Sequence, residues 1–169
     1  MAPEPNGLFS LDRVALRHAP WRGAWSFEDA DGWSPSDTIS GLTANGNLSG
    51  TVSLVSASKP RLESRSPLRM TARDRRSLFV TVSGSVPGEA GSQRTFQVWW
   101  GTETAPTLNV SRSMTATWTA DGQPQTLRFD LYTHPKWDDR IDVLWLQPFV
   151  TAVDGATFTI DDVSFGPTV

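Results

Sequence analysis

Two tryptophans lie where an aromatic ring is able to contact a ligand. The chain has eight tryptophans in 169 residues. In the alternating segments around Trp99 and Trp145, the best core candidates point to one side of a strand and these two indoles to the other. Gln97 and Gln147 share their side, and Arg128 is on the corresponding side of its own segment. Flat indoles contact the apolar faces of sugar rings, while amide and guanidinium groups hydrogen-bond to hydroxyls. These five residues therefore form the predicted binding face, with the alternative that both indoles are core residues.

Arginines form a second cluster, at positions 61, 65, 69, 73, 75 and 76. Guanidinium groups bind carboxylates and sulfates through two parallel hydrogen bonds, so an acidic polysaccharide is one candidate ligand. The spacing of the arginines favours the other interpretation, a solvated strand face paired with nearby acidic residues. A net charge of −3 and the scarcity of aromatics among these arginines argue against nucleic acid as a partner.

One segment of the chain contains residue types that are able to act in catalysis. Tyr132, His134 and Lys136 are side-chain types that act as acid and base in a polysaccharide lyase. They fall in a single loop, whereas such catalysis draws its groups from several strands around a cleft. The chain also lacks cysteine, a Gly-x-Ser-x-Gly motif and a recognisable carboxylate pair for glycoside hydrolysis. We therefore expect no catalysis and no catalytic residues, with a polysaccharide lyase or glycoside hydrolase as the enzymatic alternative.

The elements that must position these residues are short strands. Glycine-containing turns separate apolar runs at 48–55, 77–83, 95–100, 113–119, 126–131, 141–148 and 156–165. Helical periodicity is absent, and no apolar stretch approaches the length of a membrane span, so no membrane partner is expected. The pattern predicts an all-β protein, a β-sandwich or jelly roll, with residues 1–23 as an extension and residues 24–169 as a single domain.

The order of motifs gives a more specific expectation. The opening Trp25-Ser26-Phe27-Glu28 with Gly32-Trp33, and the closing Ile160-Asp161-Asp162-Val163, resemble the galactose-binding-like jelly rolls of bacterial carbohydrate-binding modules. The resemblance spans about residues 24–166. It implies a non-catalytic module or accessory domain that recognises a polysaccharide or oligosaccharide on one sheet face through aromatic stacking and hydrogen bonds. A scaffold of the same fold that contacts other protein domains is the alternative.

The same resemblance implies a structural calcium ion and a location. Similar modules hold Ca²⁺ between their first and last strands, which points to Glu28, Asp161 and Asp162 as oxygen ligands. Solvated carboxylates at strand ends are the alternative interpretation. The N-terminal residues lack a basic and an apolar segment of the secretory type. The absence of cysteine is nevertheless compatible with the extracellular or cell-surface location that we expect for such a module, within a larger parent protein.

Overall fold

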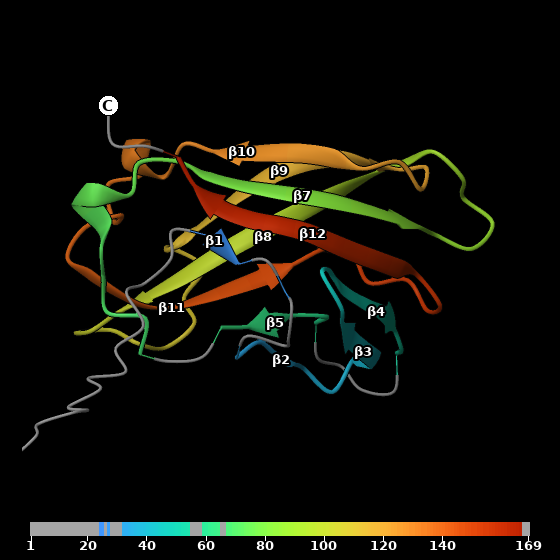
Figure 1. Ribbon diagram of the computed structural model, residues 1–169, viewed down its shortest axis with the longest axis horizontal. Coiled ribbons are helices and arrows are strands. Elements are labelled where there is room, and N and C mark those ends of the chain that lie inside the picture. Colours follow the sequence, from blue (N-terminus) through green and yellow to red (C-terminus); the bar gives the residue numbers. More distant parts are fainter. Residues whose placement is uncertain (1–23, 26, 28–31, 55–58, 65–66, 167–169) are drawn as a thin grey trace, which may run out of the picture.

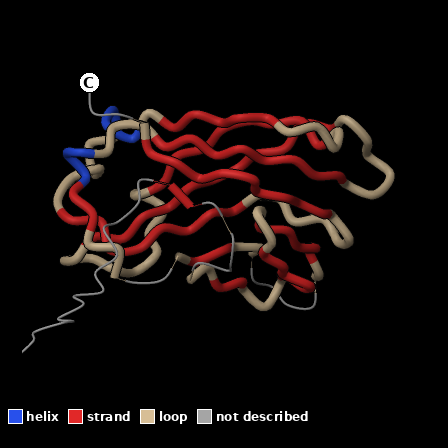
Figure 2. Tube along the Cα trace, in the orientation of Figure 1, coloured by secondary structure: helices blue, strands red, loops and turns tan. Residues whose placement is uncertain are grey.

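The computed structural model describes residues 24, 25, 27, 32–54, 59–64 and 67–166. Two antiparallel sheets pack face to face in these residues (Figures 1 and 2). The predicted extension, residues 1–23, lies outside the described residues. No described helix is long and apolar enough to cross a membrane.

The first sheet, here called sheet A, has the strand order β10-β7-β12-β4-β3, with β1 paired to β12. Its strands are β1 (Ala24–Trp25), β3 (Ile39–Ala44), β4 (Leu48–Val52), β7 (Leu78–Ser85), β10 (Gln125–Phe129) and β12 (Thr157–Phe165). One edge of β12 pairs with β7, and the other pairs first with β4 and then with β1. The opening and closing motifs therefore lie on adjacent strands.

The second sheet, sheet B, has the order β2-β5-β11-β8-β9, with β6 paired to β11. Its strands are β2 (Ser34–Pro35), β5 (Leu62–Glu63), β6 (Met70–Thr71), β8 (Ser92–Thr102), β9 (Ser113–Ala120) and β11 (Arg140–Gln147). Two 3-10 turns, η1 (Ala72–Asp74) and η2 (Leu131–Thr133), lie at one end of the sandwich (Figures 1 and 2).

The structure confirms the all-β prediction. Each of the seven apolar runs contains a strand of four or more residues. The sequence did not reveal β3 or the two-residue strands, because they have no alternating stretch long enough to detect. In β3 the chain also contains Gly41 at a φ of 61°, beside an irregularity in its pairing with β4.

The core fills the space between the sheets, and the alternation of residues sorts the side chains as predicted. Phe96, Val98 and Trp100 of β8 belong to the main buried cluster, as do Leu144 and Leu146 of β11. The same cluster contains Trp33, Trp118 and Trp137. Residues that alternate with these on sheet B consequently face outward.

Candidate functional site

The outer face of sheet B brings four of the five predicted binding residues together. Strand register places Trp145 opposite Trp99 and Gln147 opposite Gln97. The first of these pairs belongs to a row that crosses five strands in the order Ser34, Glu63, Trp145, Trp99 and Ser113. Residues opposite one another in an antiparallel sheet have side chains in contact distance, so this row forms a continuous surface.

Hydrogen bonds fix both indoles. Trp145 Nε1 donates to Glu63 Oε2 at 2.9 Å, and Trp99 Nε1 donates to Gln147 Oε1 at 3.3 Å. Gln147 in turn donates through Nε2 to the carbonyl of Phe149 at 3.2 Å. Because its Nε1–H group is hydrogen-bonded, each indole is held in one orientation, so the two rings form a preorganised surface.

The loop between β8 and β9 covers part of this face, which the sequence did not indicate. Trp99, Val143 and Trp145 form a small cluster separate from the main core, and Leu108 of the loop packs against it. Both indoles are only 7% exposed, so they are not the open platforms that we expected. Gly101 allows the covering: a Cβ there would lie 2.7 Å from the carbonyl oxygen of Pro106. A glycine on the outward side of a strand indicates such a close approach of another backbone segment.

A groove of about 300 Å³ remains open beside Trp145. Its walls combine the indole and Leu108 with the carboxylate of Glu63 and the guanidinium of Arg61. Ser34, Pro35 and Ser36, from β2 and the residue after it, complete the lining. An apolar surface with a few convergent donors and acceptors is the usual composition of a small-molecule site. Of the residues predicted as the binding face, Trp145 alone lines this groove.

The other predicted residues of this face support the groove rather than line it. Gln147 is fully buried, and Trp99 lies between it and the covering loop. Gln97 is also buried and donates through Nε2 to Ser113 Oγ at 2.9 Å. Glu63 and the β2 residues were missed because two-residue strands give no detectable alternation.

Arg128 lies on a different sheet from its predicted partners. It belongs to β10 of sheet A, where it pairs across the strand with Phe79 and forms an ion pair with Asp130 at 2.8 Å. Alternation correctly predicted that Arg128 faces outward. It carries no information on which of the two sheets a strand joins, so the expectation that Arg128 shares the face of Trp99 is wrong.

The carboxylates predicted to bind calcium lie at a β-bulge. Ile160 and Val163 are both buried, and between them the pairing of β12 with β7 shifts by one residue. Two consecutive residues with core positions on either side must both point away from the core, so the bulge turns Asp161 and Asp162 outward together. They are partly buried, and Asp162 Oδ2 accepts a hydrogen bond from Ser164 at 2.8 Å. Glu28, the third predicted ligand, lies outside the described residues.

The three candidate catalytic residues do not converge. His134 packs edge-on against Trp100, with ring centroids 4.8 Å apart, and its Nδ1 accepts the backbone N–H of Lys136. Lys136 Nζ donates to Ser111 at 2.8 Å, while Tyr132 is exposed and contacts Arg76. Each side chain therefore has a different set of neighbours.

His134 should make the stability of the domain depend on pH. Burial lowers the pKa of His134 below its ordinary value of 6.5, and the charge of Lys136 adds to this effect. The unfolded chain then binds a proton that the folded chain does not, so the free energy of unfolding should fall as the pH drops below about 6.5. We expect the urea midpoint to decrease between about pH 7 and pH 5, and to decrease less in His134→Gln. An equal decrease in both proteins would contradict this assignment.

Comparison with solved structures identifies the architecture. The family 11 carbohydrate-binding module from Clostridium thermocellum, in complex with a β-1,3-1,4-mixed-linked tetrasaccharide, superposes with a TM-score of 0.58. It is 10% identical in sequence, and the match covers 86% of this chain and 94% of the module. The fold is therefore a β-sandwich jelly roll, which this chain shares with that carbohydrate-binding module. A second such jelly roll, the non-crystalline cellulose specific module CBM28, has a TM-score of 0.57 and 13% identity, with 79% of this chain and 86% of the module covered.

The same jelly roll also occurs inside a larger enzyme. An arabinose-bound GH51 α-L-arabinofuranosidase matches with a TM-score of 0.56 and 9% identity, over 83% of this chain but only 24% of the enzyme. No protein-family model and no curated protein matches the sequence. At these identities the similarity establishes the fold, while the function must be argued from the groove.

Proposed function

We propose that this jelly roll is a non-catalytic carbohydrate-binding domain, and that the groove beside Trp145 on the outer face of sheet B holds the sugar. The observation that carries the proposal is the fixed indole of Trp145, flanked by the carboxylate of Glu63 and the guanidinium of Arg61. The exposed edge of the indole and Leu108 give the groove an apolar wall against which a sugar ring packs, and the charged groups hydrogen-bond to its hydroxyls.

The two structural neighbours described above support this proposal, because they are carbohydrate-binding modules with the same architecture. A groove of this volume accommodates one or two sugar units. Such a small contact buries little area and displaces water from well-solvated hydroxyls, so we expect modest affinity for each site. A polysaccharide ligand would place the domain outside the cell or at its surface, as an accessory to a larger parent protein.

Binding of the whole chain to a panel of neutral and acidic polysaccharides tests this function. We expect one neutral class to retard the protein in affinity electrophoresis and to give a saturable titration. Glu63→Gln preserves the shape of the groove and an acceptor for the Trp145 indole, but removes the charge; it should weaken binding by about tenfold. Arg128→Gln, on the other sheet, is the matched control and should bind normally. Absence of binding to every neutral polymer would exclude the groove beside Trp145 as the sugar site.

We further propose that Asp161 and Asp162, with Glu28, hold a structural calcium ion. The bulge in β12 orients both aspartates to one side, next to the strand edge shared by β4 and β1. An ion bound there would connect the first and last strands. Because such an ion binds only the folded state, a chelator should lower the melting temperature, and added Ca²⁺ should restore it. The variant Asp161→Asn should respond less to both additions, and an unchanged melting curve in the chelator would contradict this site.

A further inference from the structure

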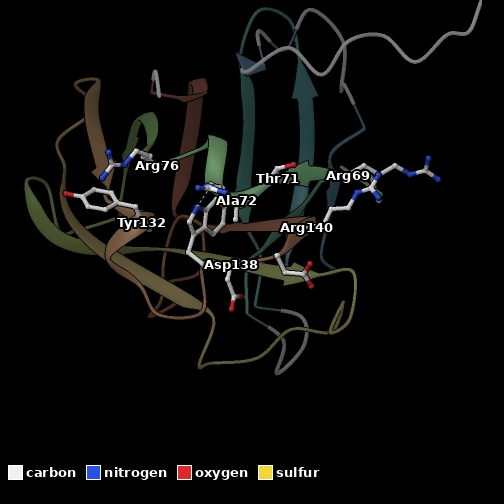
Figure 3. Close-up of a pocket in the computed structure, with 10 residues that line it drawn as sticks. Arg69, Thr71, Ala72, Arg76, Tyr132, Asp138 and Arg140 are labelled. Carbon is white, nitrogen blue, oxygen red and sulfur yellow. Dashed lines mark hydrogen bonds between the residues drawn. The ribbon is translucent and has the colours of Figure 1, made fainter. Parts of the chain in front are cut away.

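A second cavity, of about 770 Å³, shares no lining residue with the groove. It lies where η1, η2 and the start of β11 come together, at the end of the sandwich that carries both 3-10 turns (Figures 1 and 3). The arginine-rich part of the sequence forms much of its wall. Contrary to the sequence interpretation, the described members of this cluster do not share one strand face: Arg73 lies in η1, and Arg61 and Arg69 directly precede the two-residue strands β5 and β6.

The floor of the cavity is rigid. The buried Trp137 indole donates through Nε1 to the carbonyl oxygens of Ala72 at 3.1 Å and Arg75 at 2.7 Å. The backbone N–H of Ala72 donates to the carbonyl of Asp139 at 3.1 Å. These bonds connect η1 to the chain that leads into β11, so the two walls keep a fixed separation without a ligand.

The lining carries more positive than negative charge: Arg69, Arg73, Arg76 and Arg140, against Asp138 and Asp139. Among the described residues, the first three arginines have no carboxylate within ion-pair distance, and Arg140 has one 3.8 Å away on Glu103. Unpaired guanidinium groups beside a rigid cavity favour an anionic ligand with a planar acid group.

The charges occupy two opposite flanks. Figure 3 shows Arg76 with Tyr132 on one side of the cavity and Arg69 with Arg140 on the other, with Asp138 between them. The guanidinium of Arg76 lies 4.5 Å from the centroid of the Tyr132 ring, which is 49% exposed. This flank therefore combines a positive charge with an exposed aromatic surface.

Backbone strain is concentrated at the same cavity. The described residues include three non-glycine residues in the left-handed region, and two of them line it: Arg69 at a φ of 53° and Asp139 at a φ of 61°. This conformation is unfavourable for a long side chain such as that of Arg69. Strained residues of this kind are often retained where they position a functional group.

We propose that this cavity is a second binding site, which takes the acid groups of an anionic polysaccharide. The two flanks bind acid groups on separate sugar units, Tyr132 contacts a sugar ring, and Asp138 accepts hydrogen bonds from hydroxyls between them. A nucleic acid fits less well, because it presents a phosphate at every unit and would meet Asp138 and Asp139, on a chain with a net charge of −3. This site does not depend on the groove beside Trp145.

Titration of the whole chain with polygalacturonate and with its methyl ester, in buffer without added calcium, tests the second site. Esterification removes the negative charge and keeps the sugar backbone, so we expect it to weaken binding at least about tenfold. A second comparison, of binding to dextran sulfate with binding to dextran, shows whether the site accepts sulfate in place of carboxylate. The double variant Arg69→Gln/Arg76→Gln removes one arginine from each flank and should lose most of the acid-dependent binding.

Two further variants separate a site from general charge attraction and from misfolding. Arg94→Gln/Arg128→Gln removes the same charge outside the cavity and should bind polygalacturonate as the unmodified protein does. Arg69→Gly removes one guanidinium and also relieves the left-handed backbone, so it should weaken binding without lowering the melting temperature.

Three results would overturn the second site. These are equal losses in the two double variants, equal binding of polygalacturonate and its ester, and tighter binding of single-stranded DNA or phosphatidylserine vesicles than of either acidic polymer. The outcome is distinguishable from that of the proposed function. Glu63→Gln affects the neutral polymer only, and the arginine variants affect the acidic polymers only.

Discussion

Trp145→Ala is expected to abolish most binding of neutral polysaccharide while leaving the domain folded. The side chain forms part of one wall of the groove with Leu108, and its loss removes this part of the apolar wall and the hydrogen bond that orients Glu63. A buried aromatic at the centre of a binding site commonly contributes about 2 kcal/mol or more, which corresponds to a roughly thirtyfold loss of affinity. Titration with the neutral polysaccharide identified by the panel measures this change.

The stability of the Trp145→Ala variant decides what the loss of binding means. Trp145 packs in the small outer cluster with Trp99, Val143 and Leu108, outside the main core. We therefore expect the free energy of unfolding to fall by only about 1–2 kcal/mol. Trp145→Phe serves as the matched variant, because it keeps an aromatic surface and should keep part of the affinity. Unfolding of the alanine variant at room temperature would show that the ring is a core residue.

Trp100→Ala is expected to have the opposite effect: a large loss of stability without a direct loss of sugar contacts. Trp100 follows Trp99 in the sequence but points into the sandwich, is fully buried, and donates through Nε1 to the carbonyl of Lys136 at 2.9 Å. It also packs against His134 and Trp137. Truncating such a ring costs about 3–5 kcal/mol, which lowers the melting temperature of a domain of this size by roughly 10 °C.

Chemical denaturation of the Trp99→Ala and Trp100→Ala variants, side by side, checks this prediction. Both changes remove an indole from β8, so differences in unfolded-state effects are small. The midpoint should fall much further for Trp100→Ala, and the slope of the transition should stay the same in both. Equal destabilisation of the two variants would mean that the covering loop makes the outer cluster as important for stability as the main core.

Alternation was sufficient to predict which side chains face the core. Phe96, Val98 and Trp100 point inward and Gln97 and Trp99 outward, as a period of two requires. Alternation was also sufficient to predict the all-β class, because each long strand contains several repeats of the two-residue pattern. The consecutive aspartates of the closing motif, flanked by apolar residues on both sides, contained the signal for a bulge, although we interpreted them only as possible ligands.

Information about which segments meet in space was missing from the sequence. Arg128 faces outward as predicted, but its strand joins sheet A. The groove depends on Glu63 of β5 and on β2, and each of these two-residue strands is too short to show an alternating pattern. It also depends on the loop between β8 and β9, which passes close to the sheet at Gly101. Three of the arginines assigned to a solvated strand face, Arg69, Arg73 and Arg76, instead line a cavity beside the two 3-10 turns, whereas Arg61 lines the groove.

The indole N–H signals of nitrogen-15-labelled protein test the central claim most directly, because each tryptophan reports on its own surroundings. During a titration with an oligosaccharide of the polymer that binds, the signals of Trp145 and Trp99 should shift together and saturate. The signals of Trp100 and Trp118 should stay in place, because both rings are buried in the main core between the sheets, away from the groove. Saturable shifts confined to Trp137 or other tryptophans, with Trp145 unchanged, would contradict the assignment of the groove as the neutral sugar site.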